Sequence, residues 1–384
     1  MRVFLTLAAV LGAVAALLAA AGLGLAHVFR KGALDLRTGP DPLDLEVAAI
    51  GDGRITLRRT RATRSDDWAM PGAFGLAGAH AYHRVGEVIE LRPGEAVREH
   101  LGGRGVFVPG DMARMDPFAF EGDPAAALGL GFETVQVASP LGAMPAWFIP
   151  GSADTWAVLV HGKGASRRET LRILPALVEQ GLPCLAVTYR NDAETANSDD
   201  ARYGYGRHEW QDLEAAVRYA LDHGAGRIVL VGFSMGGAIC MSFLAKSALA
   251  RSVAGVILDA PMLDLRETVA HGATSAGIPR HALSLSNRVA SHRYGLDWDE
   301  VDYLRGAGSI QAPMLLFHGA ADRTVPVATS DRLAEVLPHL VTYVRIPGAG
   351  HVQGWNVDRE RYVAAVRIFL TRVLSDERLV QASL

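Results

Sequence analysis

Cysteine is nearly absent from this chain, with only Cys184 and Cys240 among 384 residues. Two cysteines cannot build the disulfide framework of a small secreted protein, and their separation matches no zinc or redox motif. Each lies in an apolar stretch, so we expect two buried thiols. The cysteine content therefore excludes a disulfide-stapled scaffold and leaves the cell compartment open.

An excess of basic charge is missing as well. Lysine and arginine total 38 against 41 acidic residues, which gives a formal net charge of −3, and the arginines are scattered through the chain. Nucleic-acid-binding proteins concentrate basic residues on one face, so we expect no nucleic acid as a partner. With 49% hydrophobic and 21% charged residues, the composition is that of a folded protein with one large domain and additional segments.

Aspartate, glutamate, lysine and arginine are absent from Val3 to Phe29. This segment is longer than the roughly 20 residues that cross a bilayer, and longer than the roughly 7–15 apolar residues of a secretory signal. We therefore predict a single-pass transmembrane anchor over residues 1–31 and a protein located at a membrane. A cleaved signal peptide that ends near residues 19–21 is the alternative. Basic residues flank both ends, so the sequence does not assign the side of the membrane.

A small β-rich module and a linker are predicted over residues 32–130. Glycine, proline and aspartate separate short alternating or apolar runs, which read LDLEVAAI, RITLRRT, GEVIEL and GVFVPGDM. The stretch FEGDPAAALGLG indicates the linker. His80 and His83 have no cysteine or acidic residue at metal-ligand spacing, so we expect structural histidines and no metal site.

From residue 131 to residue 384, apolar strand patterns alternate with helical patterns. Strands separated by helices of this length pair in parallel, and near-continuous apolar strands fit a sheet that is covered on both faces. An insertion, residues 262–311, interrupts the alternation. We therefore predict an α/β domain with a mostly parallel sheet and helices on both faces, whose site lies beyond the carboxyl ends of the strands.

A serine stands where a buried strand is predicted to end. The stretch RIVLVGFSMGGA contains the pattern G-x-S-x-G, with Ser234 between Gly232 and Gly236, and a helical pattern follows. In this pattern the strand turns sharply into the helix and exposes the hydroxyl at the edge of the sheet. Five-residue matches also arise by chance, but the strand before and the helix after favour a nucleophile.

Two further strand ends supply an acid and a base. Asp322 follows the strand MLLFHG and His351 follows VTYVRIPGAG, so the chain order is serine, aspartate, histidine. Each alone has a plain structural explanation, as a helix cap or a turn residue. Together they predict a catalytic triad, in which His351 takes the proton of Ser234 and Asp322 orients the imidazole.

The oxyanion that forms in acyl transfer needs N–H donors. We predict that the backbone N–H of Met235, at the start of the helix, supplies one of them. The backbone N–H of Lys163, in the glycine-rich loop HGKGAS, is predicted to supply the other.

The stretches LVHGKGAS, VGFSMGGA, LLFHGAADRTVP and GAGH together resemble serine hydrolases of the α/β-hydrolase superfamily. Within it, they look like the group of prolyl-oligopeptidase-like and dienelactone-hydrolase-like enzymes, over residues Phe132 to Leu374. YRND and EWQDLEAAVRYA are similar to stretches of membrane-anchored bacterial hydrolases with an N-terminal module. The resemblance implies an α/β-hydrolase fold, a small-molecule or peptide acyl substrate, cleavage of an ester, thioester or peptide bond through an acyl-serine, and no cofactor.

The sequence leaves several alternatives open. A catalytically silent binding or scaffold protein, or an acyltransferase, would share this fold. Some members of the fold take the acid from the position of Asp259, at the end of GVILDA, although the glycine-bearing loop favours Asp322. Residues 262–311 lie where the fold carries a cap that helps to line an acyl pocket, but they could also pack only on the surface. Trp355, Asn356 and the loop 190–200 are expected to border the site, and the oligomeric state stays undetermined.

Overall fold

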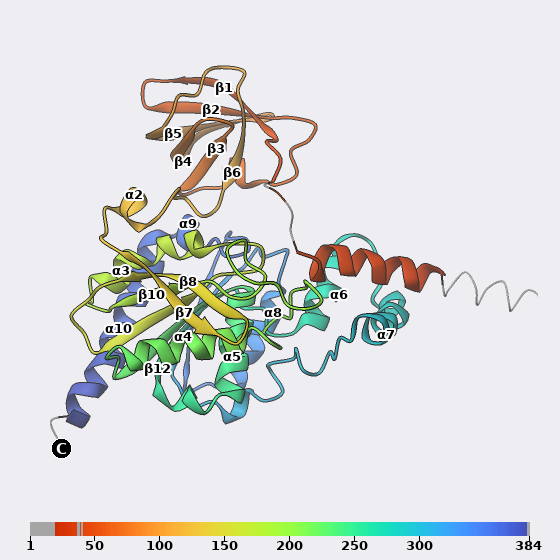
Figure 1. The fold of residues 1–384 in the computed structure, drawn as a ribbon. Coiled ribbons are helices and arrows are strands. Elements are labelled where there is room, and N and C mark those ends of the chain that lie inside the picture. The colour runs from red at the N-terminus through yellow and green to blue at the C-terminus, as the bar shows by residue number, and fades with distance from the viewer. Residues whose placement is uncertain (1–19, 37–38, 40, 382–384) are drawn as a thin grey trace, which may run out of the picture.

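The computed structural model describes residues 20–36, 39 and 41–381. It consists of a small β-barrel, a larger α/β domain on which the barrel sits, and a helical N-terminal segment at the side of that domain (Figure 1). The predicted β-rich module is therefore present in part, as the barrel. The predicted α/β domain follows it in the chain.

Six antiparallel strands close the barrel in the order β1-β2-β5-β4-β3-β6, with β6 paired to β1. Alternation along β2 buries Ile55 and Leu57 inside and leaves the arginines exposed. In β6 it buries Ala113 and Met115 in the barrel core, so the residues between and after them belong to the outer face. The strands are β1 (Leu45–Gly51), β2 (Arg54–Arg59), β3 (Phe74–Gly78), β4 (Tyr82–Arg92), β5 (Glu95–Arg104) and β6 (Met112–Asp116).

The α/β domain is built on an eight-stranded sheet with the order β14-β13-β12-β11-β9-β10-β8-β7. The strands from β14 to β10 pair in parallel, and β8 and β7 add an antiparallel hairpin at one edge. The parallel strands near the centre are buried throughout, as their near-continuous apolar sequences predict. The strands are β7 (Glu133–Ser139), β8 (Gly142–Ile149), β9 (Thr155–Val160), β10 (Cys184–Val187), β11 (Arg227–Phe233), β12 (Val253–Asp259), β13 (Met314–Gly319) and β14 (Val341–Ile346).

Helices cover both faces of this sheet, because its strands bury side chains on both faces. Val158 of β9 packs in the cluster that contains α4 and α5, whereas Leu159 packs in the cluster that contains α3 and α10. Both cysteines are free, buried thiols, as predicted. The helices of the domain are η3 (Arg167–Arg172), α3 (Leu174–Val178), α4 (Trp210–Asp222), α5 (Met235–Lys246), η4 (Ala248–Ser252), α8 (Val327–Val336), α9 (Gly354–Val357) and α10 (Arg359–Gln381).

Part of the predicted linker is helical. Helix α2 (Pro124–Leu128) begins after Asp123, whose side chain accepts a hydrogen bond from the N–H of Ala126 at 2.8 Å. It ends at Gly129, which has a φ of 67°. An N-cap aspartate, a proline in the first turn and a glycine at the C-terminus are sufficient to form this short helix.

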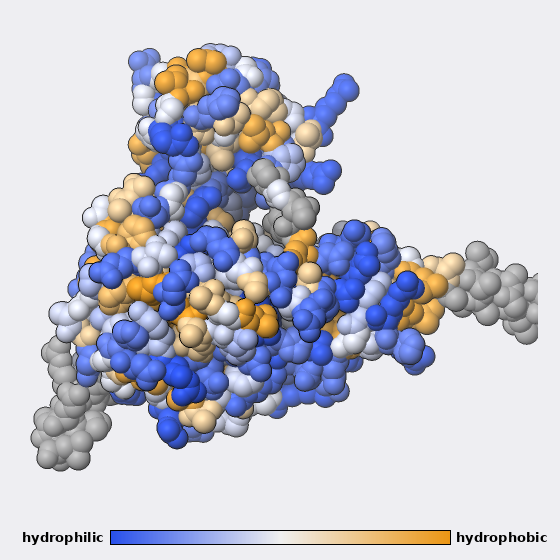
Figure 2. All heavy atoms as spheres, in the orientation of Figure 1, coloured by the Kyte–Doolittle hydropathy of each residue, from blue (hydrophilic) through white to orange (hydrophobic). Residues whose placement is uncertain are grey.

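The predicted membrane anchor is corrected by the structure. Residues 3–19 of the predicted span lie outside the described residues, and residues 20–29 are helical. Within the described parts of the chain, no helix is both long enough and apolar enough to cross a membrane. Figure 2 shows a largely hydrophilic face with apolar residues at the outer end of this N-terminal helix, where Leu23 is 46% exposed.

The insertion 262–311 packs against the N-terminal helix. It contains α6 (Leu265–Ser275), η5 (Arg280–Ala282), α7 (Leu283–Tyr294) and η6 (Ala307–Ser309), and Figure 1 shows α6 and α7 beside that helix. The backbone at Gly22 lies so close to α7 that an added Cβ would be 2.6 Å from Cγ of Leu285. The rings of Phe29 and Trp298 are 5.4 Å apart. The described end of the predicted anchor therefore contacts protein.

The barrel contacts the α/β domain through Asn356. The side-chain amide of Asn356 donates to the carbonyl oxygens of Ala73 at 2.7 Å and Pro117 at 2.9 Å, and its backbone carbonyl accepts from the N–H of Ala73 at 3.0 Å. Asn356 is 2% exposed, so these bonds are shielded from water. This residue, which was expected to border the site, instead holds the barrel in place.

A buried arginine organises the side of the barrel that makes this contact. Arg98, on β5, is fully buried and donates to five backbone carbonyls, at 2.7 to 3.3 Å. Burial lowers the pKa of Arg98 to about 10, so it stays charged at neutral pH. Four of the five carbonyls belong to the segment 67–72, which leads directly to Ala73. Arg98 therefore fixes the path of the chain toward the interface.

We expect Arg98→Met to lower the free energy of unfolding by about 3 kcal/mol or more, because several buried carbonyls lose their donor at once. Amide hydrogen exchange of peptides from β3 to β5 will report this loss locally. The matched control is Arg54→Met, at an exposed position on β2 of the same barrel, which should change stability by less than about 0.5 kcal/mol. Equal protection in the two variants would contradict the role given to Arg98.

Candidate active site

Ser234 occupies a sharp turn between β11 and α5. Its backbone has a φ of 50° and a ψ of −113°, a strained conformation for a residue other than glycine. The turn depends on small neighbours, since a Cβ at Gly236 would collide with the carbonyl oxygen of Val160 and one at Gly232 would lie 2.7 Å from the carbonyl oxygen of Gly236. The G-x-S-x-G pattern therefore forms the strand-turn-helix geometry that exposes the hydroxyl.

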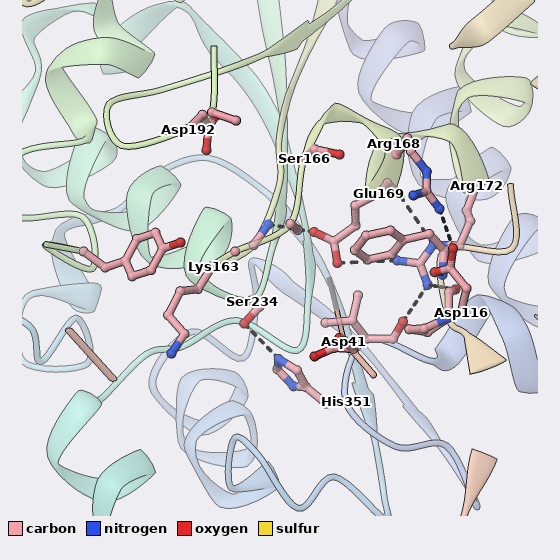
Figure 3. Close-up of a pocket in the computed structure, with 18 of the residues that line it drawn as sticks. Asp41, Asp116, Lys163, Ser166, Arg168, Glu169, Arg172, Asp192, Ser234 and His351 are labelled. Carbon is pink, nitrogen blue, oxygen red and sulfur yellow. Dashed lines mark hydrogen bonds and ion pairs between the residues drawn. The ribbon is translucent and has the colours of Figure 1, made fainter. Parts of the chain in front are cut away.

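The structure brings Ser234, His351 and Asp322 together. Nε2 of His351 is 2.8 Å from Oγ of Ser234 (Figure 3). Nδ1 of His351 is 2.7 Å from Oδ2 of Asp322. The serine follows β11, the aspartate follows β13, and the histidine follows β14. All three strands run in parallel, so their carboxyl ends deliver the three side chains to one edge of the sheet.

The carboxylate of Asp322 is held in its charged form. Its Oδ1 accepts the backbone N–H groups of Thr324 at 2.7 Å and Val325 at 2.9 Å, and Nε2 of His318 lies 3.2 Å from Oδ2. Burial alone would raise the pKa of Asp322, but the bonds to His318 and His351 and their charges outweigh it and hold the pKa well below its usual range. Asp322 is therefore an anion at any working pH.

The imidazole of His351 is a stronger base than a free histidine. Burial acts to lower its pKa, but the hydrogen bond and the charge of Asp322 outweigh burial, so the pKa is raised above the ordinary 6.5. The bond to Asp322 also fixes the proton on Nδ1 and leaves Nε2 to accept from Ser234. The side chain is 21% exposed, so a bound molecule can reach it.

Asp259, the alternative acid, lies elsewhere in the site. It is buried at the end of β12, and its Oδ2 has no hydrogen-bond partner among the described residues. Burial raises the pKa of Asp259 to about 6, against the opposing charge of Arg172. Its backbone carbonyl, 2.9 Å from the N–H of Ser234, supports the turn. The geometry thus pairs His351 with Asp322 and assigns Asp259 a structural contact.

The two predicted oxyanion donors belong to segments next to Ser234, since a Cβ at Gly162, the neighbour of Lys163, would lie 3.1 Å from Cβ of Ser234. Met235 is the first residue of α5, where helical N–H groups have no partner within the helix. Lys163 is in the loop after β9, and the preceding N–H, that of Gly162, donates to Oε2 of Glu169 at 2.6 Å. The Lys163 side chain does not reach the hydroxyl, because its Nζ donates to the carbonyl oxygen of Gly32 at 2.7 Å.

A cavity of about 460 Å³ opens beside Ser234 and His351. Its walls come from the end of β6, the loop after β9, η3 and the loop after β10, and polar and charged side chains predominate among them (Figure 3). Residues 191–193 of the predicted rim line it. No described residue of the insertion 262–311 does, so the prediction that this insertion lines the pocket is corrected: the barrel takes its place.

Sequence reasoning missed the residues that the barrel and η3 bring to the cavity: Arg114, Asp116, Arg168, Glu169 and Arg172. The side chain of Arg168 forms an ion pair with Asp116 across the two domains. The alternation in MARMD, with Ala113 and Met115 facing inward, was the available signal for the outward residues of β6. The local sequence does not show which other part of the protein these outward residues of β6 contact.

Within the described ranges, no group of three or more His, Cys, Asp or Glu side chains is placed to hold a metal ion. His83 instead stacks on His100, whose Nε2 is 2.8 Å from Nδ1 of His83.

Comparisons with known proteins agree with this architecture. The uncharacterized protein Rv2307c of Mycobacterium tuberculosis is 27% identical over 236 residues, which cover 59% of this chain and 74% of that protein, and protein MT2364 from a second strain gives the same values. The structure of the esterase Pf2001 of Pyrococcus furiosus aligns with a TM-score of 0.53 and 23% identity over 66% of this chain and 96% of that one. At such identity, the likeness shows the fold alone.

Two family models match the chain. One is described only as a domain of unknown function, DUF8805, and covers residues 46–116, which correspond to the barrel. The other, the alpha/beta hydrolase family, covers residues 157–366 and includes the strands that deliver Ser234, Asp322 and His351. Because this second match spans more than half of the chain, the protein belongs to the alpha/beta hydrolase family.

Proposed function

We propose that this protein is a serine hydrolase that cleaves an ester, thioester or peptide bond of a small-molecule or peptide substrate. The observation that carries the proposal is the hydrogen-bonded chain Ser234–His351–Asp322, with links of 2.8 and 2.7 Å, at the wall of an accessible cavity. A serine hydroxyl is a weak nucleophile at neutral pH and needs such a base. A protein that only binds a partner has no use for this chain.

In the first half of the proposed reaction, Nε2 of His351 takes the proton of Ser234 while Oγ attacks the acyl carbon. The tetrahedral intermediate then collapses, the bond to the leaving group breaks, and His351 returns the proton to the leaving group. In the second half, His351 deprotonates a water that attacks the acyl-serine, and the acid is released. Asp322, held as an anion, stabilises the imidazolium at both stages.

The N–H groups of Met235 and Lys163 are the proposed oxyanion donors. Glu169 supports this arrangement indirectly, because its bond to the N–H of Gly162 ties down the loop that carries Lys163. A fixed loop keeps the donor aimed at the developing charge, which is what preorganised electrostatic stabilisation requires.

The finer assignments stay predictions. Membership of the prolyl-oligopeptidase-like or dienelactone-hydrolase-like group rests on the sequence motifs alone. An acyltransferase would use the same acyl-serine and differ only in the second acceptor. A catalytically silent scaffold would retain the fold without a reactive serine, so reactivity of Ser234 separates it from both enzymes.

We expect a fluorophosphonate probe to label the purified protein at Ser234, and Ser234→Ala to abolish both labelling and hydrolysis of 4-nitrophenyl butyrate. The loss of turnover should be on the order of 10⁶-fold, because the nucleophile itself is removed. Peptide mass spectrometry locates the label, and circular dichroism checks that the variant is folded. If the wild-type protein is not labelled under conditions in which a control serine hydrolase is labelled, the proposal that this protein is an enzyme is refuted.

The two buried aspartates should behave differently. We expect Asp322→Asn to lower kcat by up to roughly 10⁴-fold, because the imidazole loses its orienting anion. Asp259→Asn serves as the matched control and should keep most of its kcat, since Asp259 does not bond His351. Steady-state kinetics with 4-nitrophenyl butyrate decides, and the reverse pattern would transfer the acid role to Asp259.

The pH profile should follow the pKa of His351. Only the neutral imidazole accepts a proton, so kcat/KM should fall as the pH is lowered through a value above 6.5. In Asp322→Asn the favourable charge is lost while burial remains, so the residual activity should fall at a lower pH than in the wild type. An unchanged midpoint in the variant would show that Asp322 does not set this pKa.

A further inference from the structure

Among the residues that the structure describes, eight charged side chains line the cavity beside Ser234, four of each sign: Asp41, Asp116, Glu169 and Asp192, with Arg114, Lys163, Arg168 and Arg172. The acidic members are engaged by the protein. Asp116 binds Arg168, Glu169 accepts the N–H of Gly162, Asp192 accepts from Nε2 of His161 at 2.9 Å, and Asp41 has a partner of its own.

Three of the four cations are engaged as well. Nζ of Lys163 donates to the carbonyl oxygen of Gly32, and the guanidinium of Arg168 donates to Asp116 and to the carbonyl oxygen of Phe120. Arg172, whose side chain is 2% exposed, donates to the carbonyl oxygens of Pro117 and Val352 and to Oδ1 of Asn356. Each of these three side chains bonds the protein around the cavity, although Nη2 of Arg172 has no hydrogen-bond partner among the described residues and lies 3.7 Å from Oε1 of Glu169.

Arg114 differs from the other three. Its side chain makes no hydrogen bond or ion pair with any residue in the parts of the chain that the structure describes, although it lines the cavity. The position of Arg114 on β6 explains why its side chain reaches the cavity. Its neighbours Ala113 and Met115 point into the barrel core, so Arg114 belongs to the outer face. Asp116 lies on the same outer face and is bound to the α/β domain by Arg168. The barrel thus presents a permanently charged, partly buried guanidinium to the same cavity as the nucleophile.

We propose that Arg114 recognises an anionic oxygen group, a carboxylate or a phosphate, on the substrate of Ser234, and that the barrel acts as a specificity element of the active site. The guanidinium forms two parallel bonds with either group, and these bonds are strong when the donor is charged. A cavity of about 460 Å³ holds a small molecule. The predominantly charged lining disfavours a long acyl chain and fits a short ester with an acidic end.

The proposal rests on the proposed hydrolase function, and two readouts keep them separate. The first is the ratio of kcat/KM for mono-4-nitrophenyl glutarate, which carries a carboxylate on the acyl side, to kcat/KM for 4-nitrophenyl butyrate. Arg114→Gln should lower this ratio about 10- to 100-fold, the worth of one hydrogen bond to a charged group. Arg114→Lys should recover part of it. Arg54→Gln, on the exposed face of the same barrel, is the matched control and should leave it unchanged.

The second readout needs no catalysis. Binding of glutarate and of inorganic phosphate to Ser234→Ala should be measured by calorimetry, with and without Arg114→Gln, and circular dichroism should verify the fold of each variant. Weaker binding of either anion after the loss of Arg114 supports the proposal. The anion that binds more tightly indicates whether the substrate group is a carboxylate or a phosphate. An equal effect of Arg114→Gln on both esters, or anion binding that does not depend on Arg114, overturns it. A wild-type protein that does not react with fluorophosphonate refutes the proposed hydrolase function. The calorimetry then still tests, independently of catalysis, whether Arg114 binds an anion.

Discussion

The guanidinium of Arg172 connects the parts of the active site. It is almost fully buried and donates to Val352, the residue after His351, to Pro117 at the end of the barrel, and to Asn356, which carries the barrel. It also lies 3.7 Å from Glu169, which holds the loop of Lys163. Burying a cation costs free energy, which neutral carbonyls offset only if the geometry is good. One charge therefore couples the segment of His351, the loop of Lys163 and the interface between the two domains.

This coupling makes the barrel a part of the candidate active site. The cavity has walls from both domains, and the contacts of Asn356 that hold the domains together lie within a few residues of His351. Sequence comparison treats the two parts separately, since one family model ends at residue 116 and the other begins at residue 157. The cavity beside Ser234, however, has residues of both parts in its walls.

The triad and the sheet could be predicted because both follow from local patterns. Apolar strands that alternate with helices imply a parallel sheet, and the residues at their carboxyl ends, Ser234 and His351 among them, must then share an edge. The sequence favoured Asp322 over Asp259 because of its glycine-bearing loop. The geometry agrees, since Asp259 ends β12, whereas Asp322 lies in the loop after β13 with its Oδ2 2.7 Å from Nδ1 of His351.

The walls of the cavity could not be predicted, because they depend on how distant segments pack. Asn356 and Pro117 are 239 residues apart, and no periodicity relates them. The insertion 262–311 has the length and position of a cap, but its surface complements the N-terminal helix through Leu285 and Trp298. The apolar segment before Arg30 has the composition of a membrane span. Composition alone does not distinguish an apolar helix that contacts lipid from one that packs against protein, as residues 20–29 do here.

The order in which the chain is synthesised has a consequence for this interface. The barrel is complete at residue 116, whereas one of the side chains that hold it, that of Asn356, emerges 239 residues after Pro117. At about 5–20 residues per second, this is a delay on the order of 10–50 s. During this delay the bonds of Asn356 to Ala73 and Pro117 are not available to the barrel. Arg98 lies within the barrel and binds the segment 67–72 without the second domain, so this part of the docking surface does not depend on Asn356 for its shape.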